Sequence, residues 1–198
     1  MIPLTPALVI ATANAFVGLG TKLALEECFL REVWAGAKAA SVLRWDTAFV
    51  HHVGYWSHYH HKAKQSSWPL PPTATPPELA QIAAARDALV DDPMPGDLFL
   101  LWSPAREEFL RTGIVVEVGK KRRKDLDGSR YRECVTIEGD TDPTMARGGG
   151  AVLRHERRLS SARTDRFVRW TALDARAFRA REAERPYDVL EDLLELAA

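Results

Sequence analysis

The segment Arg44-Trp45-Asp46-Thr47-Ala48-Phe49-Val50 leads from a polar break, through an aromatic and an acidic residue, into small and apolar residues. This pattern predicts a helix over residues 46–59, with an inward stripe of Phe49, Val50, Val53 and Trp56. The N-terminus of a helix has free backbone N–H groups and the positive end of the helix dipole, so an anion is stabilised there. Asp46 occupies that position.

The rest of the chain divides into a helical first half and a second half of strands. Apolar periodicity predicts further helices over residues 7–17, 23–42 and 78–89. After turn residues at 93–97, short runs predict strands over residues 98–102, 112–118, 131–137, 151–157 and 166–170. Short connections favour an antiparallel sheet, and helices followed by strands indicate an α+β domain. Residues 173–198 are expected to form a helical tail.

The composition narrows the classes of function. The 198 residues include 27 basic and 27 acidic side chains, so no net charge favours nucleic acid or a membrane surface. The two cysteines, Cys28 and Cys134, are too few for a disulfide scaffold or a zinc site, and we expect no cofactor. The apolar run from Ala7 to Leu19 lacks a basic leader and is too short to span a bilayer. We therefore expect no transmembrane segment, and a protein that is cytoplasmic or delivered by a phage or other particle.

Five histidines lie in or just after the predicted helix over residues 46–59: His51, His52, His58, His60 and His61. His58 and His61 have a helical i, i+3 spacing, which a metal site could use. No carboxylate or cysteine stands at a recognised ligand spacing. We therefore interpret the five as surface or loop histidines and expect no metal.

The densest run of charge is Lys120-Lys121-Arg122-Arg123-Lys124, between two predicted strands. One interpretation is a basic patch for phosphate or for an anionic wall polymer. The other is a solvated hairpin tip, where charges stay in water at little cost. No aromatic residues interleave with the run to stack bases, which does not favour nucleic acid.

Six short motifs follow one another in an order that resembles a known family. They are Trp45-Asp46-Thr47-Ala48-Phe49-Val50, Pro95-Gly96-Asp97-Leu98-Phe99, Thr112-Gly113-Ile114-Val115-Val116, Thr136-Ile137-Glu138-Gly139-Asp140-Thr141, Gly149-Gly150-Ala151-Val152 and Arg166-Phe167-Val168-Arg169. Together they resemble the CHAP domain, the cysteine- and histidine-dependent amidohydrolases/peptidases. The resemblance covers roughly residues 7–172, and we expect residues 1–172 to form the CHAP-like domain.

The resemblance implies a papain-like α+β fold, with N-terminal helices packed on an antiparallel, partly rolled sheet. It also implies peptidoglycan hydrolysis, as an amidase or endopeptidase. In the family pattern the helix begins Trp-Cys-Ala-Ala-Phe-Val, and the cysteine is the nucleophile. Here that position is Asp46. The histidine that acts as general base is replaced by Arg111, and the orienting positions correspond to Glu138 and Asp140.

Both residues that carry the family chemistry are therefore changed. A carboxylate is a poor nucleophile toward an amide, and arginine stays protonated, so it cannot accept a proton. We expect Asp46 and Arg111 to form an ion pair, with Asp46 also accepting backbone N–H groups and Glu138 facing Arg111. The alternative is that Asp46 is only an N-cap and Arg111 only an exposed strand residue.

Three functions follow as hypotheses. The first is a degenerate CHAP-type peptidoglycan amidase/endopeptidase homologue that serves as a binding or structural module. The second is an active cell-wall hydrolase with non-standard or engineered site residues. The third is an interaction subunit of a larger assembly, such as a phage particle or a membrane complex, which binds a protein partner through the acidic, leucine-containing end of the tail, from Tyr187 to Ala198.

Overall fold

The structure is a computed structural model of the chain, and it describes residues 4–18, 45–59, 68–70, 73, 75–141, 150–161 and 164–173. The predicted helix over residues 23–42, with Cys28, lies outside the described residues. So do His60, His61 and the tail from residue 174 onward. Among the described residues, no helix has the length and apolar character needed to cross a membrane.

The described helices are α1 (Pro6–Phe16), α3 (Asp46–Tyr59) and α4 (Pro76–Ala84). The prediction of a helix over residues 46–59 is confirmed. Helix α4 begins with a capping box, in which Thr75 and Glu78 satisfy each other's backbone N–H groups. Its predicted end at residue 89 is wrong. Asp87 adopts a left-handed conformation (φ 53°), which ends the helix, and the next residues form strand β1 (Leu89–Val90).

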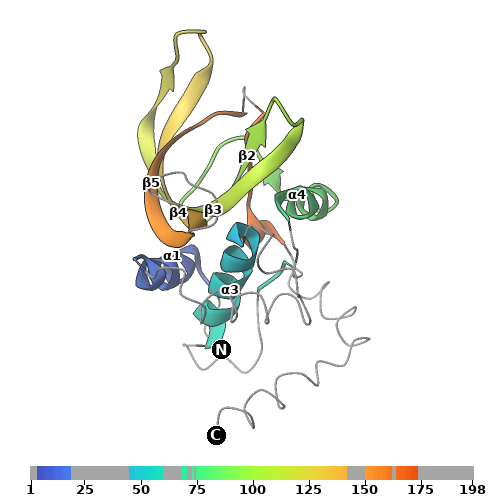
Figure 1. Cartoon of the computed structure of the whole chain (residues 1–198), viewed down its shortest axis with the longest axis vertical. Helices are drawn as coiled ribbons and strands as arrows, with labels where there is room; N and C mark the ends of the chain where they lie inside the picture. Colours follow the sequence, from blue (N-terminus) through green and yellow to red (C-terminus); the bar gives the residue numbers. More distant parts are fainter. Residues whose placement is uncertain are drawn as a thin grey trace, which may run out of the picture.

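The strands form one antiparallel sheet of six strands in the order β1-β6-β2-β3-β4-β5. The five further strands are β2 (Leu98–Ser103), β3 (Glu108–Lys124), β4 (Arg130–Thr141), β5 (Ala151–Leu159) and β6 (Arg166–Val168). A short 3-10 helix, η2 (Trp170–Ala172), follows β6. Each predicted strand is found, and the α+β class with an antiparallel sheet is confirmed. Figure 1 shows the curved sheet above α1 and α3.

The basic run at residues 120–124 lies within β3 rather than at a hairpin tip, but its side chains are exposed to solvent, as the second interpretation expects. Strand β3 continues to Lys124, and the turn is formed by the residues between it and Arg130. The hydrogen bonds between two strands join backbone atoms, and they do not depend on side chains that remain in water. Exposed basic residues can therefore continue a strand. The β3–β4 hairpin therefore projects as a charged arm (Figure 1).

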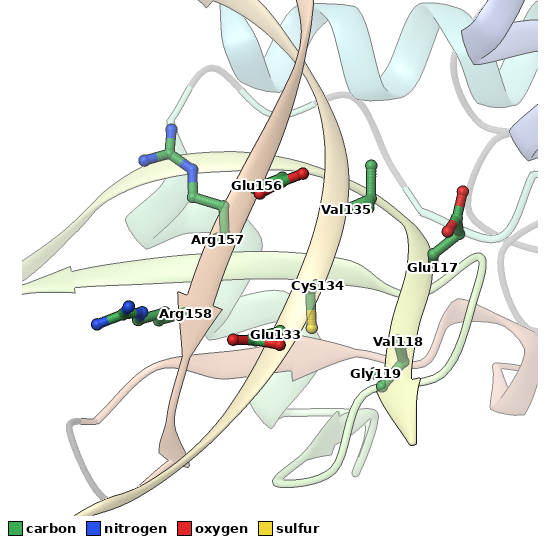
Figure 2. A pocket seen from close by; sticks show the side chains of 9 residues that line it. All are labelled: Glu117, Val118, Gly119, Glu133, Cys134, Val135, Glu156, Arg157 and Arg158. Atoms are coloured by element: carbon green, nitrogen blue, oxygen red, sulfur yellow. The ribbon is translucent and has the colours of Figure 1, made fainter. Parts of the chain in front are cut away.

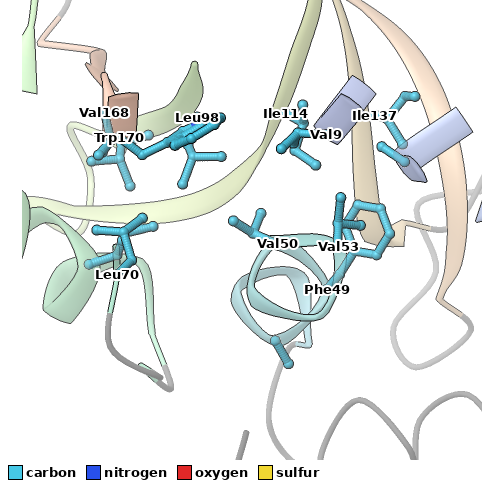
Figure 3. Packing of buried hydrophobic residues seen from close by; sticks show 14 of the residues in the cluster. Val9, Phe49, Val50, Val53, Leu70, Leu98, Ile114, Ile137, Val168 and Trp170 are labelled. Carbon is cyan, nitrogen blue, oxygen red and sulfur yellow. The ribbon is translucent and has the colours of Figure 1, made fainter. Parts of the chain in front are cut away.

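The main core lies between the helices and one face of the sheet. Phe49, Val50 and Val53 of α3 have no exposed surface and pack toward Ile114 and Ile137 of the sheet (Figure 3). Residues 46–54 of α3 are all buried. A helix that is covered on every side is a central element rather than an amphipathic surface helix, so α3 fixes the positions of its neighbours.

His51 and His52 are buried, so their prediction as surface histidines is wrong. The Nδ1 atom of His51 accepts a hydrogen bond from Trp68 Nε1 at 3.1 Å, and His51 Nε2 lies 2.8 Å from Thr73 Oγ1. The backbone N–H of Thr73 also donates to His51 Nε2 at 3.2 Å, so both ring nitrogens are engaged. Burial lowers the pKa of His51 to about 3, so this imidazole is neutral. It anchors the segment around Trp68 to α3.

A second cluster lies on the other face of the sheet and consists of Phe99, Val115, Cys134, Leu159 and Phe167, all buried. The curvature of the sheet closes over these side chains. Asp165 holds the curvature, because its Oδ1 accepts a hydrogen bond from Trp102 N–H at 3.1 Å and its Oδ2 accepts one from Ser160 N–H at 2.9 Å. One carboxylate thus joins the end of β2 to the end of β5.

Replacing Gly139 with alanine should lower the free energy of unfolding by about 1–3 kcal/mol. A Cβ atom at this position in β4 would lie 2.6 Å from Phe49 Cβ and 2.7 Å from Trp45 Cζ3. Neither neighbour can move freely, since Trp45 and Phe49 are both buried beside α3. Urea denaturation of the Gly139→Ala variant measures the effect, and a midpoint equal to that of the parent chain would contradict it.

Candidate functional site

Asp46 is the first residue of α3, because the carbonyl of Trp45 accepts the first helical hydrogen bond from Phe49 N–H at 2.9 Å. The Asp46 side chain has no exposed surface. Its Oδ1 accepts a hydrogen bond from Thr47 N–H at 2.8 Å, and its Oδ2 accepts one from Thr112 N–H at 3.2 Å. The carboxylate therefore connects the start of α3 to β3, which is more than a simple N-cap does.

Burial raises the pKa of Asp46 to about 6, since a buried carboxylate loses its hydration. The hydrogen bond from Thr112, the charge of Arg111 and the hydrogen bond from Thr47 lower the pKa, and the charge of Asp140 raises it. Asp46 is therefore mostly ionised at neutral pH and becomes protonated in mild acid. With both oxygens engaged by backbone N–H groups, it is held as a structural anion.

Arg111 lies on β3 directly before Thr112, and its guanidinium is partly buried. Its Nη1 donates a hydrogen bond to the carbonyl oxygen of Asp140 at 2.7 Å. The predicted ion pair between Arg111 and Asp46 is not formed between these two described side chains. The guanidinium is near enough for its charge to lower the pKa of Asp46. The two residues are neighbours, as expected, but each is held by the backbone.

Glu138 does not face Arg111 as predicted, because Arg157 of β5 binds it. Arg157 Nε donates to Glu138 Oε1 at 2.7 Å and Arg157 Nη2 donates to Oε2 at 2.6 Å, so the contact is bidentate. Thr136 Oγ1 donates a third hydrogen bond to Oε1 at 2.6 Å. Glu138 has no exposed surface, whereas 27% of the Arg157 side chain is exposed. A carboxylate bound by three donors has little capacity left to orient another side chain.

Asp140, the second orienting position, has a left-handed backbone (φ 54°). This conformation is unfavourable for most side chains but is adopted more readily by aspartate and asparagine. It turns the Asp140 carbonyl toward the Arg111 guanidinium. The left-handed backbone at this position is therefore suited to aspartate.

Two residues of this site were not predicted, Arg157 and His155, both on β5. His155 pairs in register with Thr136, and the charges of Glu138, Arg157 and Arg111 all affect its pKa. Burial lowers the pKa of His155, and its Nε2 atom is buried without a hydrogen-bond partner in the described chain. The inward alternation of residues 153, 155, 157 and 159 was the available signal. It was hidden because His155 and Arg157, which lie between Leu153 and Leu159 in this alternation, are polar.

The thiol of the described cysteine, Cys134, is buried and is not activated as a nucleophile. Cys134 lies in β4 beside an open hollow of about 440 Å³, which Figure 2 shows with residues from β3, β4 and β5. Burial raises the pKa of its thiol to about 11, so the thiolate is scarce at neutral pH. The lining of this hollow does not include Asp46 or Arg111.

The described part of the chain contains no group of three or more His, Cys, Asp or Glu side chains that could hold a metal ion. The structure thus brings Asp46, Arg111 and Asp140 close together where α3 meets the sheet, whereas the Glu138 side chain lies on the other face of the sheet beside Arg157. Comparison of the chain with protein-family models, curated proteins and solved structures gives no match.

Proposed function

We propose that this protein is a non-hydrolytic relative of CHAP-type peptidoglycan amidases and endopeptidases that serves as a wall-binding or structural module. The observation that carries the proposal is the state of Asp46, a buried carboxylate with hydrogen bonds to Thr47 and Thr112. In the CHAP pattern this is the position of the nucleophile.

The neighbouring side chains support the same conclusion. Arg111 cannot act as a general base, because a guanidinium remains protonated at any working pH. Glu138 is committed to Arg157. The site therefore lacks both a nucleophile and a base in the arrangement that cysteine hydrolysis requires.

The wall-binding function is tested by sedimentation with purified, insoluble peptidoglycan. The full chain should appear in the pellet, and the supernatant should contain no soluble muropeptide. Release of fragments by the unmodified chain would show an active hydrolase and overturn the proposal. Absence of the chain from the pellet would contradict the wall-binding part of the proposal.

Restoring the family residues should restore hydrolysis. We expect the double variant Asp46→Cys, Arg111→His to release soluble fragments from the same peptidoglycan, because a thiol and an imidazole would again be adjacent at the start of α3. The matched control is Asp46→Ser, Arg111→His, and the cysteine variant should exceed it by at least about 100-fold. Equal inactivity of two folded variants would contradict descent from a cysteine hydrolase.

The interaction-subunit hypothesis depends on the tail, which lies outside the described residues, and it stays a prediction. Deletion of the chain after Pro186 and measurement of the oligomeric mass test it directly.

A further inference from the structure

The β3–β4 hairpin, defined here as residues 119–132, gathers basic side chains on one of its faces. In the strand register, Arg122 lies opposite Arg132, and Lys124 lies opposite Arg130. Directly opposite residues of an antiparallel pair project from the same face. We call the face formed by Arg122, Lys124, Arg130 and Arg132 the basic face.

A single carboxylate offsets part of this positive charge. Asp92 binds Arg132 through two hydrogen bonds of 3.2 Å, and its Oδ1 lies 3.1 Å from Arg122 Nη2. The two arginines lower the pKa of Asp92, as expected for a carboxylate between guanidinium groups. Lys124 and Arg130 form no ion pair with any described residue.

This arrangement carries a cost in the free protein, because like charges that face each other across a strand pair are destabilising. Binding of an anion between Lys124 and Arg130 would remove that repulsion. Side chains two residues apart along a strand are about 7 Å apart, so the basic face presents charge as a ladder. A ladder of cations complements a ligand whose negative charges repeat along a chain.

A groove of about 340 Å³ runs beside the basic face. Its lining includes the hydroxyl-bearing Ser129, the acids Asp91 and Asp92, and three arginines of that face, Arg122, Arg130 and Arg132. Guanidinium groups and hydroxyls are donors that suit phosphate oxygens. The acids are already engaged, since Asp92 binds Arg122 and Arg132 and Asp91 lies 3.7 Å from Arg166.

We propose that the basic face and this groove bind a linear polymer that carries phosphate groups along its backbone and has no bases. The hairpin offers no ring on which a base could stack. Tyr131 is 7% exposed, and the Arg158 guanidinium lies 5.4 Å from its ring centroid. This proposal does not depend on the chemistry at Asp46.

The test uses the full chain and long-chain inorganic polyphosphate as the probe, titrated by calorimetry over a series of salt concentrations. Binding should weaken steeply with salt, as expected for release of counterions. The double variant Lys124→Gln, Arg130→Gln should bind at least about 10-fold more weakly, and its plot of log K against log salt should lose about 2 units of slope. The matched control, Arg106→Gln, Arg154→Gln, removes the same charge away from the basic face and should change affinity by less than about 2-fold.

A second measurement separates a ligand site from a structural role. The double variant Lys124→Gln, Arg130→Gln removes two facing like charges, so its thermal midpoint should equal or exceed that of the parent chain. A lower midpoint would assign these side chains to structure and overturn the proposal. Absence of polyphosphate binding at low salt, an equal loss of affinity in the control, or tighter binding of a DNA duplex of matched charge would overturn it as well.

Discussion

Replacing Arg157 with methionine should lower the free energy of unfolding by about 3–5 kcal/mol, the largest effect expected for a single side chain in this protein. Arg157 donates two hydrogen bonds to Glu138, which has no exposed surface. Methionine fills a similar volume but leaves that carboxylate buried without its cation. Such a charge has lost its water and keeps only the hydrogen bond from the Thr136 hydroxyl, so the folded state bears most of the cost.

The neighbouring arginine provides a matched control. Arg158 is exposed, and its guanidinium lies 5.4 Å from the Tyr131 ring centroid. Arg158→Met should cost no more than about 1 kcal/mol. Adding Glu138→Gln to Arg157→Met should recover much of the loss, since the amide carries no charge. Urea denaturation of the four chains measures these differences, and equal losses for Arg157→Met and Arg158→Met would contradict the role of the pair.

Asp46 and His51 should give the protein two opposed dependences of stability on pH. The folded pKa of Asp46 is raised to about 6 from the model-peptide value 3.8, so its contribution to stability is present below about pH 4 and is lost as the pH rises through 6. The folded pKa of His51 is lowered to about 3 from 6.5, so its contribution is present above about pH 6.5 and is lost as the pH falls. Between pH 4 and 6 the two slopes oppose each other.

Single substitutions should expose each slope. In Asp46→Asn the contribution of His51 is no longer offset, and stability should fall by about 1.4 kcal/mol for each pH unit below 6, or about 3 kcal/mol in all by pH 4, relative to the parent chain. In His51→Gln, stability should instead rise by a similar amount, relative to the parent chain, as the pH falls from 6 to 4. Urea denaturation at intervals from pH 4 to 7 gives these differences. A parallel profile for Asp46→Asn and the parent would show that Asp46 does not titrate in this window.

The sequence predicts the helices and strands of this fold well where the apolar residues recur at a regular spacing. Helix α3 has the predicted bounds, because its acidic first residue and its apolar spacing agree. The strands were found because each is a short run bounded by turn residues. The end of α4 was misjudged, since Leu89 and Val90 suit either element, and only the pairing of Leu89 with Val168 and of Val90 with Phe167 makes them a strand.

The candidate site was predicted in its location but not in its contacts. The motif order brings Asp46 and Arg111 near each other, yet their hydrogen bonds go to backbone atoms of Thr112 and Asp140. Almost every residue type offers the same backbone N–H and C=O groups, so a sequence pattern cannot reveal hydrogen bonds to the backbone. The partner of Glu138 depends on the β4–β5 register, and a shift by one residue would turn Arg157 to the other face.

Strand β5 also determines how the protein meets other copies of itself. It lies at one end of the strand order, and no described strand pairs with its outer edge. The N–H of Gly18 covers the start of that edge by donating to the Val152 carbonyl at 3.0 Å. Farther along, Arg154, Glu156 and Arg158 are exposed and Arg157 points inward as a charge. With no described strand paired to it, an edge with these charges resists addition of a foreign strand, and the inward-pointing Arg157 contributes to that resistance.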